Sequence, residues 1–136
     1  MLKIEHIGIA VKDIDGANKL FAALLGEPHY KTESVESEKV STSFYKVGES
    51  KIELLEASDP NSAIAKFIEK RGEGIHHIAF EVDDIHAEMK KLKDKGFVFT
   101  RDEPFRGADN KMVCFLHPKS TSGVLVELCQ EIRSRQ

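Results

Sequence analysis

The chain contains an internal repeat, and this repeat limits its possible folds more than any other feature of the sequence. Residues 4–14 match residues 75–85 at an offset of 71, with Ile, His, Ile, Val, Asp and Ile at the same places. A shorter match, residues 52–54 with 126–128, follows at an offset of 74. Fixed-offset similarity marks duplicated structural units. The sequence therefore predicts two copies of one unit, over about residues 3–57 and 74–130.

Each copy carries the pattern of a strand, a helix and three more strands. Residues 4–11 and 75–82 alternate as half-buried strands do. The helix that follows has Asp13 or Asp84 at its N-cap, and Gly26 or Gly96 ends it. The remaining strands are predicted around residues 30–33, 40–47 and 51–55, and around 97–102, 112–117 and 124–129. A helix over about residues 61–71 links the two copies.

The predicted fold class is α+β, with two tandem βαβββ units that form one cupped sheet with the helices outside. A unit of about 60 residues makes a marginal core by itself, so the two copies are expected to share one domain over residues 1–136. In that arrangement, equivalent residues of the two copies lie on opposite walls of the cup.

Composition excludes several classes of protein. The net charge of −3 and the pI of about 6.1 argue against a nucleic-acid partner, which requires a basic face. The mean hydropathy is −0.33, and the sequence has no apolar run of the roughly 20 residues that cross a bilayer. Cys114 and Cys129 lack C-x-x-C spacing and are expected to be reduced core residues. The N-terminus has no signal-peptide pattern, so we expect a cytoplasmic protein.

Two kinds of polar residue recur in the repeat. His6 corresponds to His77, and Glu53 corresponds to Glu127. All four lie within apolar strand patterns, where an imidazole or a carboxylate is costly without a partner. A single strand histidine is usually a core or surface residue, and a single strand glutamate usually faces solvent. Recurrence of both types at both places favours a divalent metal site with nitrogen and oxygen ligands.

Several longer segments resemble a known family. They are residues 6–11, 51–56, 64–80, 115–120 and 123–128, and they extend over residues 4–130. They resemble the vicinal oxygen chelate superfamily, which includes glyoxalase I, and within it most closely the methylmalonyl-CoA epimerases. The motifs specific to the epimerases are Gly-Glu-Gly-Ile-His-His at 72–77 and His-Pro-Lys-Ser at 117–120.

The resemblance implies a fold, a metal and a reaction. It implies the glyoxalase-like fold and one divalent ion per chain, held by His6, Glu53, His77 and Glu127. Co²⁺ is the expected ion, and Mn²⁺, Zn²⁺ or Ni²⁺ also suit two nitrogen and two oxygen ligands. The implied activity is that of an isomerase, the epimerisation of (R)- and (S)-methylmalonyl-CoA by α-proton abstraction and enolate stabilisation. The implied partners are a CoA thioester and a second copy in a homodimer, with no nucleic acid and no membrane.

Inversion needs an acid/base group on each face of the substrate. Some relatives place a glutamate base where this chain has Thr42, and a threonine cannot take a proton from carbon. Two possibilities stay open. Glu53 and Glu127 act as a catalytic pair with Thr42 as a spectator, which we favour, or Glu38 reaches in from the entrance of the same strand.

Other residues receive weaker predictions. Lys111, Lys119 and Arg106 are expected in loops beside the last strands, where their charges could bind CoA phosphates. Ser120 could donate a hydrogen bond to the substrate carboxylate. His76 is expected to point to the sheet face opposite His77.

Two other functions share this pattern. A glyoxalase I-type lactoylglutathione lyase has the same ligands but a glutathione hemithioacetal as substrate. A metal-free ligand-binding protein of the same fold generally lacks the full set of four ligands, which is complete in this chain. Metal analysis separates the binding protein from the enzymes, and assays with both substrates separate the two enzymes.

Overall fold

The computed structural model describes residues 1–133. The first strands and helices are β1 (Lys3–Ala10), α1 (Ile14–Leu25), β2 (Lys31–Val35), β3 (Val40–Val47), β4 (Ser50–Ala57) and α2 (Ala63–Arg71). They are followed by β5 (Gly74–Glu81), α3 (Ile85–Asp94), β6 (Phe105–Arg106), β7 (Lys111–Leu116), a 3₁₀ turn (Pro118–Ser120) and β8 (Val126–Glu131). The chain divides into two compact units. We call His6–His76 the N-terminal unit, and Met1–Glu5 together with the chain from His77 onward the C-terminal unit.

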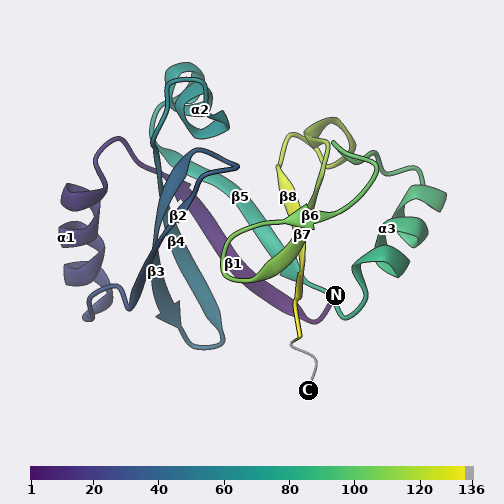
Figure 1. Cartoon of the computed structure of the whole chain (residues 1–136), viewed down its shortest axis with the longest axis horizontal. Helices are drawn as coiled ribbons and strands as arrows, with labels where there is room; N and C mark the ends of the chain where they lie inside the picture. The colour runs from purple at the N-terminus through teal and green to yellow at the C-terminus, as the bar shows by residue number, and fades with distance from the viewer. Residues whose placement is uncertain (134–136) are drawn as a thin grey trace. The chain divides into compact units, whose positions relative to one another are not determined.

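In the N-terminal unit the strands follow the order β2-β3-β4-β1, and α1 covers one face (Figure 1). β1 runs parallel to β4, while β2, β3 and β4 are antiparallel neighbours. Val11, Tyr45 and Leu54 are buried on the covered face. The apolar side of α1 packs on them through Ile14, Ala17, Phe21 and Leu25. The opposite face of this sheet is therefore the one available for polar side chains.

The C-terminal unit has the corresponding order β5-β8-β7-β6. β5 runs parallel to β8, and β8, β7 and β6 are antiparallel neighbours. Ile85 and Met89 of α3 are buried against Val82 and Leu128, which matches the helical spacing in the sequence. The helix therefore packs on its own sheet, as α1 does in the N-terminal unit.

The repeat extends to individual hydrogen bonds. Both helices begin at an aspartate N-cap, as predicted. The N–H of Ile14 donates to the Glu56 carboxylate on β4 at 2.8 Å. At the equivalent place, the N–H of Ile85 donates to the side-chain oxygen of Gln130 on β8, also at 2.8 Å. A side chain of β4 in one unit and of β8 in the other thus accepts a hydrogen bond from the first N–H of the helix. This N–H has no partner within the helix. The predicted βαβββ order is confirmed in both units.

One predicted strand is wrong. Residues 97–102 form a single isolated bridge, between Phe99 and Leu116, and the third strand of this unit is the two-residue β6. Phe97 and Phe99 instead pack against the core beneath α3. Pro104, which lacks a backbone N–H, lies between this segment and β6. The N–H of Thr100 donates to Phe115 and the N–H of His117 donates to Val98, so the segment pairs with β7 only briefly around this bridge.

The predicted linking helix is α2, which begins at its N-cap Ser62. The Ser62 hydroxyl accepts a hydrogen bond from the N–H of Ala65 at 3.1 Å, and Ile64 is the buried residue of the helix. Over residues 1–133, the helices are all too short or too polar to cross a lipid bilayer.

Candidate metal and catalytic site

The N-terminal unit contains one buried pair of a histidine and a glutamate. β1 and β4 run side by side with Gly8 beside Glu53, so His6 and Glu53 share the face that α1 leaves open. His6 Nδ1 lies 3.0 Å from Glu53 Oε2, and the two residues are 6% and 4% exposed. We call this sheet face the His6 face.

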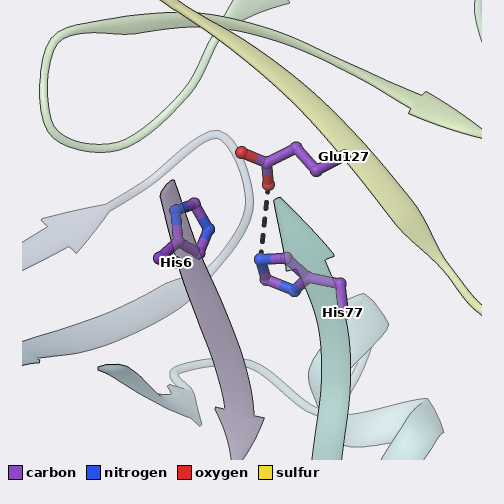
Figure 2. A group of neighbouring side chains, drawn as sticks. All are labelled: His6, His77 and Glu127. Atoms are coloured by element: carbon purple, nitrogen blue, oxygen red, sulfur yellow. Dashed lines mark ion pairs between the residues drawn. The ribbon is translucent and has the colours of Figure 1, made fainter. Parts of the chain in front are cut away.

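The C-terminal unit contains the equivalent pair. β5 and β8 are parallel neighbours with Ala79 beside Glu127, and His77 Nε2 lies 3.3 Å from Glu127 Oε1 (Figure 2). Both residues are 6% exposed. The ring of Phe115 meets the His77 imidazole edge to face, with 5.9 Å between the ring centres. This edge-to-face contact favours one orientation of the imidazole.

Both pairs suit the ligand sphere of a divalent ion. Two ligand atoms at about 2.1 Å from one ion, at right angles to each other, lie about 3.0 Å apart. The nitrogen-to-oxygen distances of 3.0 and 3.3 Å are of this size. Imidazole and carboxylate together suit Zn²⁺, Co²⁺, Mn²⁺ and Ni²⁺. Each unit therefore carries a buried pair of donors that can hold a divalent ion.

His76 is not part of either pair, as the sequence predicted. Its ring meets the Phe67 ring of α2 at 5.0 Å and 81°, so it lies against the linking helix. Burial there lowers the pKa of His76 to about 4. It is therefore a neutral packing residue at neutral pH.

The predicted position of Lys111 is wrong. Lys111 is the first residue of β7, not part of a loop, and it is 7% exposed. Its charge lowers the pKa of the nearby Cys129 thiol and so partly opposes the effects of burial and of neighbouring carboxylates. This burial speaks against an exposed phosphate contact, and the predicted role of Lys111 in substrate binding remains a prediction.

The other predicted substrate contacts lie at the surface. Lys119 is exposed in the 3₁₀ turn, and Arg106 is exposed on β6 rather than in a loop. The Ser120 hydroxyl donates to the carbonyl oxygen of His117 at 2.9 Å, and the His117 ring accepts from the N–H of Lys119. These hydrogen bonds shape the turn itself. Roles of Lys119 and Ser120 in substrate binding remain predictions.

Glu38, the alternative second base, and Thr42, the position where some relatives carry that base, both lie near the start of β3. Glu38 lies in the turn between β2 and β3, with its N–H donating to the carbonyl of Val35, and is half-buried. Thr42 lies within β3 and is 1% exposed. Thr42 is therefore inside the sheet, whereas Glu38 is at its margin.

The sequence analysis missed one buried acid. Glu5 lies directly before His6 in β1 and is 2% exposed. Its charge, like that of Glu127, raises the pKa of Cys129, although burial is the main cause. Burial first and Glu127 second raise the pKa of Cys114 to about 12. Both thiols are thus protonated at neutral pH, which makes each a poor nucleophile. The repeat contained the signal, since Glu5 stands where the other copy has His76.

The family model described as "Glyoxalase/Bleomycin resistance protein/Dioxygenase superfamily" matches residues 5–115. The chain belongs to this superfamily. The matched range contains three of the four predicted ligands, His6, Glu53 and His77.

Relatives of this chain in the superfamily include epimerases. The ethylmalonyl-CoA/methylmalonyl-CoA epimerase of Cereibacter sphaeroides is 40% identical over 130 residues, which cover 94% of this chain and 97% of the relative. The mitochondrial methylmalonyl-CoA epimerase of Homo sapiens is 39% identical over 129 residues, covering 94% of this chain and 73% of the relative.

A solved structure extends this similarity to three dimensions. A variant of the Streptomyces coelicolor methylmalonyl-CoA epimerase, in complex with 2-nitronate-propionyl-CoA, is 37% identical with a TM-score of 0.93. The match covers 100% of this chain and 99% of that one. The predicted fold class, two βαβββ units of the glyoxalase type, is confirmed.

Proposed function

We propose that this chain is an isomerase that interconverts the (R) and (S) epimers of methylmalonyl-CoA. The observation that carries the proposal is the presence of both buried histidine–glutamate pairs in a chain whose relatives are epimerases over nearly its whole length. The substrate class, an acyl-CoA with a carboxylate on its α-carbon, follows from the substrates named for those relatives.

The two pairs would serve one divalent ion per chain, with His6, Glu53, His77 and Glu127 as its ligands. The support is the duplication of the pairs and the fit of each to a ligand sphere. When bound, such an ion stabilises negative charge on the thioester oxygen. Co²⁺ is the first candidate, and Mn²⁺, Zn²⁺ and Ni²⁺ are the others.

The two glutamates would move the proton. One carboxylate takes the α-proton, and the electron pair of the broken C–H bond passes toward the thioester carbonyl, which leaves a planar carbon. The other glutamate, protonated, returns a proton to the opposite face. Neither step changes an oxidation state. Burial of both carboxylates excludes water, which keeps the electrostatic stabilisation strong and protects the intermediate.

The two alternative functions have weaker support. A glyoxalase I-type lyase would use the same four residues, but the relatives that cover the chain are named as epimerases. A metal-free binding protein would not need two buried pairs at 3.0 and 3.3 Å. We therefore place the epimerase first.

Metal content tests the ligand assignment. The purified chain should bind one divalent ion, and His77→Ala should lower its affinity by more than about 100-fold, because a direct ligand is lost. Elemental analysis after loading and desalting measures the occupancy. His76→Ala is the matched control, since this adjacent imidazole packs on Phe67 and should leave the occupancy unchanged. Full occupancy in His77→Ala would contradict the assignment.

Isotope exchange tests the reaction. In D₂O the metal-loaded protein should introduce one deuterium at the α-carbon of methylmalonyl-CoA while the two epimers equilibrate, because the proton passes through a group that exchanges with solvent. Mass spectrometry measures the uptake. A chain that leaves methylmalonyl-CoA unlabelled but converts a glutathione hemithioacetal would be the lyase instead.

A cytoplasmic location and a homodimer remain our expectations. Both cysteines are free thiols in buried positions, which supports a reducing compartment.

A further inference from the structure

Two buried hydroxyl groups on β3 have no hydrogen-bond partner among residues 1–133. They are Thr42 Oγ1 and Ser43 Oγ, and the two residues are 1% and 0% exposed. Burial of an unsatisfied hydroxyl opposes folding, and nearly all buried polar groups in proteins find a partner. Such a group is therefore a candidate for contact with a ligand if it faces a binding surface.

The two hydroxyls face opposite sides of the sheet. Ser43 lies opposite Leu54 and two residues before Tyr45 in the strand, and both Leu54 and Tyr45 belong to the core that α1 covers. Thr42 points the other way, because successive side chains of a strand alternate between faces. It therefore lies on the His6 face, whereas Ser43 lies in the core.

Thr42 is close to the buried pair of that face. Phe44 lies directly opposite Glu53, so Thr42 is the diagonal neighbour of Glu53 across β3 and β4. Diagonal neighbours on adjacent strands are about 7–8 Å apart, which is within reach of a small ligand that touches both. Thr42 and Glu53 are thus placed so that one ligand can contact both.

The residue opposite Thr42 on the edge strand is partly exposed. Glu33 of β2 lies directly opposite Thr42, and its side chain is 31% exposed. It forms an ion pair with Lys31 at 3.5 Å, and ion pairs at this exposure contribute little to stability. Thr42 therefore lies next to a partly exposed position at the margin of the His6 face.

We propose that Thr42 Oγ1 donates a hydrogen bond to the free carboxylate of the substrate and so selects acyl-CoA thioesters that carry this group. The proposal rests on the proposed function. A hydroxyl is a poor proton acceptor toward carbon but a good donor to a charged oxygen. Thr42 is therefore a specificity residue rather than a base. A carboxylate has about four acceptor positions, and in a buried site each oxygen needs a donor.

Ligand pairs that differ by the carboxylate test this proposal. Calorimetric titration of the metal-loaded protein compares methylmalonyl-CoA with propionyl-CoA, which lacks the carboxylate. Thr42→Val keeps the shape and removes the hydroxyl, so it should weaken methylmalonyl-CoA binding by about 10- to 100-fold. Binding of propionyl-CoA should change less than about threefold. Thr42→Ser keeps the donor and should restore most of the affinity for methylmalonyl-CoA.

Ser43→Ala is the matched control, because it removes an equally buried and unpartnered hydroxyl from the other face of the same strand. It should leave both affinities unchanged. Thr42→Ala serves as a second variant without the hydroxyl if the valine variant does not fold.

Three results would overturn the proposal: unchanged methylmalonyl-CoA binding in the Thr42 variants, equal weakening for both ligands, or the same loss in Ser43→Ala. Failure of the wild type to label its substrate with deuterium would instead overturn the proposed function. The two failures are distinguishable, because binding of the ligand pair is measured without turnover.

Discussion

Glu127→Gln should lower the rate of epimerisation by about 10²- to 10⁴-fold and leave the bound metal in place. The amide keeps an oxygen ligand but cannot take a proton, and losses of this size are typical when a general base is removed. Glu127 Oε1 lies 3.3 Å from His77 Nε2, and Glu127 is only 6% exposed. A small carboxylate from the solvent therefore cannot enter and act as the base in its place. The measurements are kcat from the rate of epimer equilibration and metal content from elemental analysis.

The control for this prediction lies on the same strand. Glu131→Gln removes an exposed carboxylate at the end of β8 and should change neither kcat nor metal content. If Glu127→Gln loses both its metal and its activity, the prediction of a retained metal is wrong, and the loss of activity then reflects the missing metal ligand. If it keeps full activity, the assignment of Glu127 as a base is wrong.

The sequence predicted the fold because the duplication constrained it twice. A single strand followed by an aspartate N-cap and a helix is compatible with many folds. Because the same series occurs twice in this chain, only folds built from two copies of one unit remain. The same recurrence matched His6 with His77 and Glu53 with Glu127. In the structure all four are buried, and each histidine contacts the glutamate of its own unit. Periodicity alone would not have distinguished these four residues from ordinary strand positions.

The errors arose where one copy departs from the other. Phe97 and Phe99 have the composition of a strand, but they pack beneath α3, and only one bridge forms. The sequence places Lys111 in a loop because the predicted strand begins only at residue 112. In the structure it begins β7, and its charge acts on the Cys129 thiol among buried groups. The residues that Phe97, Phe99 and Lys111 contact lie in other elements of the fold. No local sequence pattern therefore indicates these contacts.

Glu53→Gln should also lower the rate of epimerisation, by the same 10²- to 10⁴-fold, if the two glutamates act as a pair. Inversion needs an acid/base group on each face, and the chain has Thr42 where some relatives have a glutamate. Thr42 is 1% exposed and has no acid to offer, whereas Glu53, its diagonal neighbour on the His6 face, is a buried carboxylate at 4% exposure. The measurement is kcat together with deuterium uptake from each epimer separately.

The separate epimers make the result decisive. If each glutamate serves one face, then Glu53→Gln should still exchange the α-proton of one epimer with solvent but fail to invert it, and Glu127→Gln should do so for the other. Glu38→Gln is the companion variant, because Glu38 lies in the turn at the margin of the sheet and is the competing candidate. Near-normal epimerisation in Glu53→Gln with loss of activity in Glu38→Gln would move the second base to that turn, since a single surviving carboxylate cannot serve both faces of a planar intermediate.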